Sequence, residues 1–292
     1  MNLKNINRPT LLVIAGPTAV GKTQYAIDLA QQFQTAIISA DSRQFFKEMK
    51  IGTAAPTKQE LELVPHFFIG NLSIHDYYSA SRFEQDVLKL LPSLFVHHLL
   101  VLMCGGSGMY IDAVCQGIDD IPDPDPDLRN FVTRTFQNDG IESLRKLLQK
   151  MDKDFYNTCN LADAKRMMRA VEVSMQTGQP YSNFLSQSKK KRDFDIIKIC
   201  LTRPREILFD RINRRVELMI SQGWLQEAEQ LFPYRSLNSL NTVGYKELFD
   251  YMEGKLSLEQ ALTDIKTHTR RYAKRQMTWF QRDDSYQFEM LT

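Results

Sequence analysis

The chain of 292 residues has few cysteines and no cysteine or histidine pattern typical of a metal site. Its four cysteines, Cys104, Cys115, Cys159 and Cys200, stand far apart and include no CxxC pair. This spacing argues against a disulfide framework and a cysteine zinc site, and it predicts buried free thiols. The five histidines lack metal-ligand spacing, so we expect them to be packed or solvated.

Long apolar runs are also missing. No run reaches the roughly 18 residues that a transmembrane helix needs, so we expect no membrane-spanning segment. The opening MNLKNINRPT lacks the apolar stretch of a signal peptide. With reduced cysteines, this composition predicts a cytoplasmic protein, and a monomer is our default expectation.

Net charge is small, at +2, but its distribution is uneven. Basic residues gather at 189–192, 203–215 and 266–275, and acidic residues gather at 119–127. Such runs are often solvated helix faces. They equally allow a local basic surface for a polyanion, and the sequence leaves both interpretations open.

What the chain does contain is a phosphate-binding pattern near its start. An apolar run at residues 11–15 predicts a buried strand, and residues 24–32 have helical periodicity. Between them, GxxxxGK[ST] is matched by Gly16, Pro17, Thr18, Ala19, Val20, Gly21, Lys22 and Thr23. Backbone N–H groups and Lys22 would hold phosphate oxygens, and the Thr23 hydroxyl would hold Mg²⁺. A glycine-rich turn that binds nothing is the alternative, and the order strand, loop, helix argues against it.

The rest of the chain predicts an α/β fold: a P-loop parallel sheet flanked by helices, with an inserted all-helical domain. Alternating Pro and Asp at 118–127 mark a boundary, because such a segment continues neither a helix nor a central strand. Only helical patterns follow, to about residue 188, and a strand pattern returns at 195–201. The expected domains are a catalytic core, residues 1–120 and 195–292 with C-terminal helices, and a helical insertion, residues 121–194.

Asp41 follows a second predicted strand that begins at Thr35. Carboxyl ends of strands face the ligand crevice of an open α/β sheet, so Asp41 is expected beside the phosphate loop. The alternative is that Asp41 caps a following segment. A third predicted strand, residues 97–104, ends without the acidic residue that a standard NTPase uses to hold Mg²⁺. This absence weakens an ATPase or GTPase interpretation.

Taken in order, these motifs resemble the bacterial tRNA dimethylallyltransferase family, isopentenyltransferases that modify the adenosine next to the anticodon. The resemblance extends from residue 16 to about residue 280. Beside the phosphate loop, the matching segments are residues 41–44, 51–54, 64–66, 105–110, 165–172, 243–245 and 269–276.

The resemblance implies that the loop holds the diphosphate of dimethylallyl diphosphate, with Thr23 near Mg²⁺, and that Asp41 is the general base. Lys22 and either Arg211 or Arg215 would stabilise the departing pyrophosphate, and the sequence does not choose between the arginines. The resemblance also implies contacts to the anticodon stem-loop of tRNA by Asp41, Ser42, Arg43, Gln44, Ser107, Arg129, Lys165, Arg166, Met167, Met168, Arg169, Asn241, Thr242, Val243, Gly244, Tyr245 and Lys246.

Two other functions remain open from the residues. A P-loop small-molecule kinase would bind ATP at the same loop, although the missing acidic strand end and the helical insertion count against it. A non-catalytic RNA-binding regulator would keep a nucleotide site as a switch, and Lys22, Thr23 and Asp41 count against that function.

Overall fold

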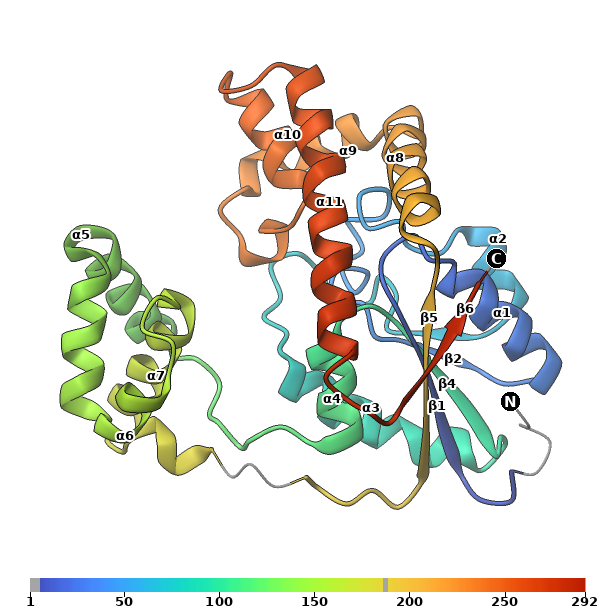
Figure 1. The fold of residues 1–292 in the computed structure, drawn as a ribbon, viewed down its shortest axis with the longest axis horizontal. Coiled ribbons are helices and arrows are strands. Elements are labelled where there is room, and N and C mark those ends of the chain that lie inside the picture. Colours follow the sequence, from blue (N-terminus) through green and yellow to red (C-terminus); the bar gives the residue numbers. More distant parts are fainter. Residues whose placement is uncertain (1–5, 186–188, 292) are drawn as a thin grey trace. The chain divides into compact units, whose positions relative to one another are not determined.

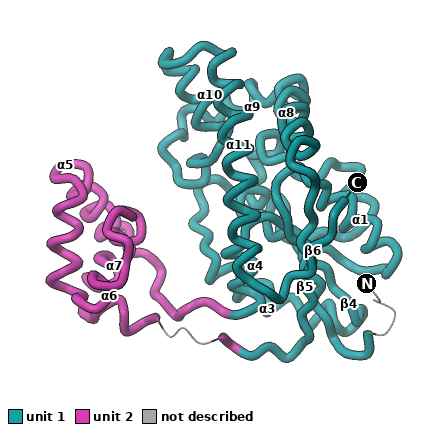
Figure 2. The backbone as a smooth tube through the Cα atoms, viewed as in Figure 1, with its two compact units in different colours: residues 1–116, 191–292 teal, residues 117–190 magenta. Residues whose placement is uncertain are grey.

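A computed structural model describes residues 6–185 and 189–291 of the chain. Two compact units divide the backbone, one formed by residues 1–116 and 191–292 and the other by residues 117–190 (Figure 2). The sequence-based boundaries of the helical part were 121 and 194. Residues 1–5, 186–188 and 292, which the expected domains include, lie outside the described residues.

The larger unit is built on one six-stranded parallel sheet (Figure 1). Its strand order is β3-β2-β4-β1-β5-β6. The strands are β1 (Thr10–Ala15), β2 (Ile37–Ser39), β3 (His66–Phe67), β4 (Leu100–Cys104), β5 (Asp195–Thr202) and β6 (Tyr286–Met290). β1 is fully buried because a parallel sheet is covered on both faces, which explains its continuous apolar sequence.

Helices cover the two faces of this sheet. The helices of the larger unit are α1 (Lys22–Phe33), α2 (Lys58–Leu63), α3 (Ala80–Phe95), α4 (Gly108–Gln116), α8 (Arg205–Ser221), α9 (Trp224–Leu231), α10 (Tyr245–Met252) and α11 (Leu258–Phe280), with 3-10 turns Phe232–Tyr234 and Asn238–Leu240. Alternate residues of β1 point to opposite faces. Leu11 and Val13 pack with α3, α4 and Phe280, whereas Leu12 and Ile14 pack with α1 and α8. A third apolar cluster, centred on Trp224 and Tyr245, joins α8, α9, α10 and α11.

The smaller unit is helical and has its own core. It contains α5 (Pro126–Met151), α6 (Lys153–Thr158), α7 (Ala164–Thr177) and the 3-10 turn Tyr181–Phe184. Buried Leu144, Leu148, Phe155 and Met167 belong to this core. α5 contains a break at Gly140, where φ is 72°.

The sequence-based fold class is confirmed. One strand was not predicted from the sequence: β6 pairs in parallel with β5 at the sheet edge. Within the described residues, no helix is long and apolar enough to cross a membrane.

Candidate functional site

The loop between β1 and α1, residues 16–21, depends on two glycines. Gly16 (φ 144°) and Gly21 (φ 115°) adopt backbone conformations that other residues rarely reach. A Cβ at Gly16 would lie 2.6 Å from the carbonyl oxygen of Leu201, so the loop passes directly against β5. α1 begins at Lys22, and the unpaired N–H groups of its first turn therefore adjoin the loop.

Cationic side chains hold the carbonyl groups of this loop. Lys22 Nζ donates to the carbonyl oxygens of Gly16 (3.0 Å) and Pro17 (2.9 Å). Arg211 Nε donates to Ala19 (2.8 Å), and Arg203 Nε donates to Val20 (2.8 Å). By contrast, within the described residues no hydrogen bond is made by the backbone N–H groups of Ala19, Gly21, Lys22 and Thr23. Fixed carbonyls and unbonded N–H groups are the arrangement expected of an anion site.

Two further groups of the loop, Lys22 and the Thr23 hydroxyl, are suited to an anion. Burial lowers the pKa of Lys22 from its ordinary value, and no carboxylate among the described residues forms an ion pair with it. Thr23 is half-buried, and its hydroxyl makes no hydrogen bond to any of the described residues. A phosphate oxygen would therefore give Lys22 a stronger partner than two neutral carbonyls.

Asp41 follows β2 and begins a turn. Its Oδ1 accepts a hydrogen bond from the backbone N–H of Arg43 at 3.0 Å, whereas Oδ2 accepts none from the described residues. No helix starts here, so Asp41 does not act as a helix N-cap. Its carboxylate instead stabilises the turn that follows β2.

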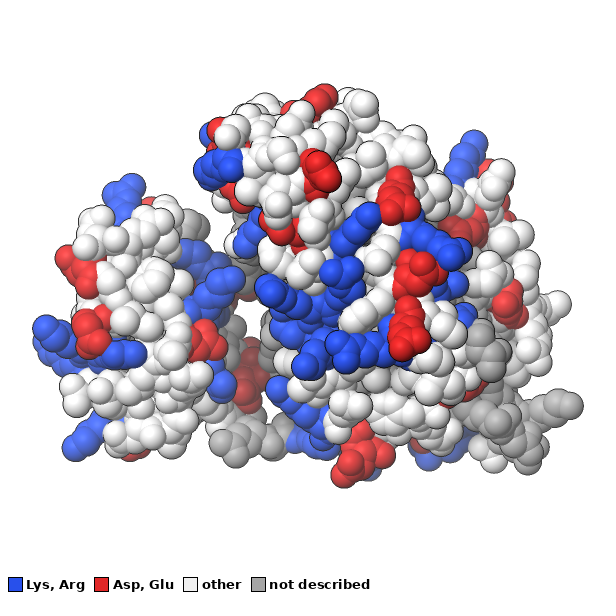
Figure 3. Space-filling model, turned by 45° about the horizontal axis from the view of Figure 1, so that its top comes forward, with Lys and Arg blue, Asp and Glu red and all other residues white. Residues whose placement is uncertain are grey.

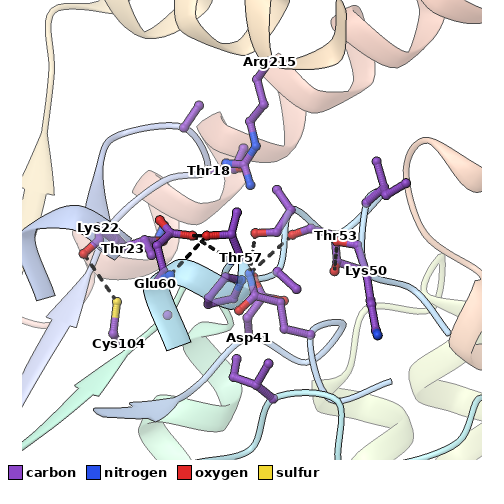
Figure 4. Close-up of a pocket in the computed structure, with 18 of the residues that line it drawn as sticks. Thr18, Lys22, Thr23, Asp41, Lys50, Thr53, Thr57, Glu60, Cys104 and Arg215 are labelled. Atoms are coloured by element: carbon purple, nitrogen blue, oxygen red, sulfur yellow. Dashed lines mark hydrogen bonds between the residues drawn. The ribbon is translucent and has the colours of Figure 1, made fainter. Parts of the chain in front are cut away.

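Arg215 lies on α8, one turn after Arg211. Figure 4 shows its guanidinium pointing from the helix toward the loop that carries Thr18, with Asp41 lower in the same pocket. Within the described residues, Arg215 forms no hydrogen bond and no ion pair. Burial lowers the pKa of Arg215, and the Asp41 carboxylate acts in the opposite direction. Arg211, in comparison, is bonded to the loop through Nε.

These groups line one cavity of about 1200 Å³. That volume is above the roughly 300–1,000 Å³ of pockets for one small molecule. Predicted site residues in its lining are Thr18, Ala19, Gly21, Lys22, Thr23, Asp41, Gln44, Arg211 and Arg215. Gly16, Pro17 and Val20, the other residues of the predicted loop, are buried and do not line the cavity among the described residues.

A network around Glu227 fixes the segment 50–54, which forms another wall of the cavity. The Glu227 carboxylate accepts hydrogen bonds from the backbone N–H groups of Lys50 (2.9 Å), Ile51 (2.8 Å) and Gly52 (2.8 Å). It also accepts one from the Tyr245 hydroxyl at 2.6 Å. Sequence reasoning missed Glu227, because no motif signals a carboxylate that binds a distant backbone.

Several predicted RNA contacts instead hold the walls of the cavity together. Ser107 Oγ accepts a hydrogen bond from the Ser42 N–H at 2.9 Å. Arg43 Nη1 donates to the carbonyl oxygen of Ser239 at 2.9 Å, and Gln44 Nε2 donates to that of Ala54 at 3.2 Å.

The segment 241–246 is divided between surface and core. Asn241 and Lys246 are exposed, and Thr242 and Val243 are half-buried. Gly244 and Tyr245 are buried in this structure, so their side chains are not available at its surface. No residue of this segment is among the described residues that line the cavity.

In the helical unit, the residues predicted to contact RNA differ in solvent exposure. Lys165 and Arg166 are exposed on α7, and Met168 is half-buried. Met167 is fully buried in the unit's core. Arg129 and Arg169 both pair with the buried carboxylate of Glu172, at 3.1 and 2.6 Å, so they stabilise the unit's interior.

Sequence reasoning also missed cavity residues outside the phosphate loop. They are Lys47, Lys50, Arg214, Tyr272 and Gln276. Tyr272 and Gln276 lie four residues apart on α11, a spacing that places them on one helix face. Burial, followed by the negative charge of Asp41, raises the pKa of Tyr272 to about 12.

Basic side chains gather in the middle of the face drawn in Figure 3, on the larger unit. α11 contributes the exposed Arg271, Lys274 and Arg275. Among the described residues, no group of three or more His, Cys, Asp or Glu side chains could hold a metal ion.

Comparisons with known proteins agree on one family. A family model described as IPP transferase matches residues 44–283. The chain is 50% identical over 274 residues to tRNA dimethylallyltransferase 1 of Phocaeicola vulgatus, covering 94% of this chain and 91% of that protein. It also resembles the crystal structure of the full-length tRNA isopentenylpyrophosphate transferase of Bacillus halodurans, with a TM-score of 0.70, 33% identity and coverage of 97% and 90%. For a structure of a eukaryotic dimethylallyltransferase acting on tRNA, the TM-score is 0.78 at 29% identity, with coverage of 93% of this chain and 69% of that one. With its phosphate loop, Asp41 and the matched segments in place, this chain belongs to the IPP transferase family.

Proposed function

We propose that this protein transfers a dimethylallyl group from dimethylallyl diphosphate to N6 of the adenosine next to the anticodon in tRNA and releases pyrophosphate. The observation that carries the proposal is the convergence of Lys22, Thr23, Arg215 and Asp41 on one cavity. Family membership supports the same chemistry, because the relatives are named as enzymes of this reaction.

Leaving-group stabilisation drives the first half of the reaction. As the allylic C–O bond breaks, its electron pair and the negative charge stay on the pyrophosphate. The unbonded loop N–H groups, Lys22 and the unpaired Arg215 neutralise that charge in a partly buried site. Arg211 holds Ala19 in place, so Arg215 is the preferred of the two candidate arginines.

Proton acceptance by Asp41 completes the reaction. The adenine N6 lone pair is delocalised into the ring, and its proton becomes acidic only once nitrogen bonds to carbon. The Asp41 oxygen that is not engaged by Arg43 can accept this proton.

A magnesium ion fits the residues present. Mg²⁺ retains several waters and binds substrate phosphates with few protein ligands, so the single unbonded Thr23 hydroxyl is sufficient as a protein contact. When bound, the ion adds positive charge to the departing pyrophosphate.

The tRNA must present its adenosine outside the anticodon-loop stack, at a cost of a few kcal/mol that loop contacts offset. Exposed Lys165 and Arg166 and the basic face of α11 are suitable for backbone phosphates. A cytoplasmic location and a monomeric state stay predictions.

The main alternative is phosphoryl transfer from ATP at the same loop. β4 ends in Cys104, and burial raises the pKa of this thiol to about 11, so the strand end offers a neutral group in place of a metal-binding carboxylate. This feature and the family both favour prenyl transfer.

Incubation of the purified protein with tRNA, Mg²⁺ and either dimethylallyl diphosphate or ATP tests the proposal. We expect pyrophosphate release and a prenylated adenosine, detected by nucleoside mass analysis, only with dimethylallyl diphosphate. The Lys22→Met variant serves as the control that lacks the loop cation. Phosphoryl transfer from ATP, or unmodified tRNA under both conditions, would contradict the proposal.

A further inference from the structure

The side chain of Gln276 spans two loops of the cavity. From α11, its Oε1 accepts a hydrogen bond from the backbone N–H of Thr18 at 2.8 Å. Its Nε2 donates to the carbonyl oxygen of Gly106, in the β4–α4 connection, at 2.9 Å. Gln276 is only 6% exposed, so water cannot easily replace either hydrogen bond.

Together the two bonds require a side chain that both accepts and donates. The Thr18 N–H needs an acceptor and the Gly106 carbonyl needs a donor, and a glutamine side chain supplies one of each. The absence of a side chain at Gly106 leaves space for the Gln276 amide, because a Cβ at this position would lie 2.2 Å from Gln276 Nε2.

The bond to Thr18 acts on the centre of the phosphate loop. Thr18 lies between Gly16 and Ala19, two of the loop positions where the backbone turns through positive φ. Its N–H is bonded to a side chain, whereas those of Ala19, Gly21, Lys22 and Thr23 make no bond within the described part of the chain. Fixing Thr18 therefore fixes the direction of neighbouring N–H groups toward an anion.

The bond to Gly106 reaches the opposite wall. Ser107, the next residue, binds the backbone of Ser42 beside Asp41. Through one buried amide, α11 thus holds the loop that binds the diphosphate and the loop that supports the carboxylate.

We propose that Gln276 is a positioning residue that sets the phosphate-loop N–H groups for diphosphate binding by clamping Thr18 to Gly106. The proposal rests on the proposed function for the identity of the diphosphate substrate.

The test is a calorimetric titration of the full-length protein with inorganic pyrophosphate in Mg²⁺. We expect Gln276→Met, which has a similar size and neither polar group, to weaken pyrophosphate binding about tenfold, as befits the loss of one polar contact. Affinity for an anticodon stem-loop RNA should stay within about twofold of wild type. Gln260→Met, on the exposed first turn of the same helix, is the matched control and should leave both affinities unchanged.

Gly106→Ala tests the clamp from its other side. The added methyl displaces the flexible end of Gln276, so this variant should lose the same affinity, and the double variant should lose no more than either single one. If Gln276→Met fails to fold, this variant alone decides the question.

Gln276→Glu gives a readout that simple packing would not affect. The ionised carboxylate cannot donate to Gly106, whereas the protonated acid both donates and accepts. Its affinity relative to wild type should therefore rise as the pH is lowered from about 8 to about 6.

Wild-type pyrophosphate affinity in folded Gln276→Met and Gly106→Ala, or additive losses in the double variant, would overturn the clamp. In turnover, the same variants should raise KM for dimethylallyl diphosphate with little change in KM for tRNA. Because the titration measures binding, the clamp is judged separately from prenyl transfer. A wild-type protein that binds pyrophosphate but does not modify tRNA would overturn the proposed function alone.

Discussion

At the scale of single residues, Asp41 combines a structural and a chemical task. One carboxylate oxygen stabilises the turn after β2, and the other carries no hydrogen bond within the described residues. A change that removes only the charge separates these tasks, because asparagine still accepts the hydrogen bond from Arg43.

Asp41→Asn should lower the single-turnover rate of prenyl transfer by about 10²–10⁴, the usual contribution of a positioned base. Affinity for tRNA should change little, since the turn is kept. Rapid-quench measurement with saturating tRNA checks this expectation. A near-normal rate would remove Asp41 from the role of general base.

Unlike Arg211 and Arg214 on the same helix, Arg215 has no hydrogen-bond or ion-pair partner among the described residues. Arg215→Gln should weaken binding of dimethylallyl diphosphate and slow its cleavage by about tenfold or more, because a partly buried charge is lost beside the leaving group. Arg205→Gln, at the exposed start of the same helix, is the control. Equal kinetics of the two variants, measured as kcat and KM, would contradict the assignment.

At the scale of helices and strands, β6 depends on an ion pair at its entrance. Asp283 accepts from Lys198 Nζ of β5 at 2.7 Å, and Lys198 is buried. This strand was not predicted from the sequence, because it spans only residues 286–290 and its pairing partner, β5, lies far earlier in the chain. A five-residue edge strand carries too little local pattern to be recognised.

This ion pair predicts a pH dependence of stability. Burial acts to raise the pKa of Asp283, but hydrogen bonds from Lys198 and Ser285 outweigh it and lower the pKa from 3.8 to about 2. A group whose pKa is lowered on folding stabilises the protein above its unfolded pKa, and this stabilisation is lost as the pH falls toward the folded pKa.

Asp283→Asn should therefore reduce the free energy of unfolding by about 2 kcal/mol at neutral pH and by less as the pH drops from about 5 to about 2. Urea unfolding of wild type and variant across this range provides the comparison. A constant difference between the two curves would show that the carboxylate contributes no such stabilisation.

The smaller helical unit carries a prediction about RNA binding. Lys165 and Arg166 are exposed, whereas Arg129 and Arg169 are engaged with Glu172. Lys165→Gln and Arg166→Gln should each reduce the slope of log Kd against log salt for tRNA by about 1, which is the effect of losing one phosphate contact. Lys150→Gln, exposed on α5, is the control. Unchanged slopes of log Kd against log salt in both variants would exclude α7 from the RNA interface.

At the scale of the whole molecule, the parts predicted from sequence were those with local signals. The phosphate loop is contiguous, and Asp41 follows a strand whose direction the α/β pattern predicts. Glu227 had no such signal, and the matched segment 269–276 gave no sign that Gln276 would bind Thr18. Gln276 meets Thr18 across a sequence separation of 258 residues, so its role depends on how α11 packs against the sheet. Burial was equally unpredictable from the sequence: Tyr245 belongs to a matched motif and is fully buried.

The chain as a whole therefore brings one phosphate-binding loop and one strand-end carboxylate to a common cavity, with basic helices nearby in the same unit. The central claim is that this cavity makes the prenylated adenosine of tRNA in the cell. Mass analysis of tRNA nucleosides from a strain lacking this gene tests the claim most directly. We predict that the prenylated adenosine is absent, returns with the wild-type gene and does not return with Asp41→Asn. A prenylated adenosine that persists without the gene, or that Asp41→Asn restores fully, would contradict it.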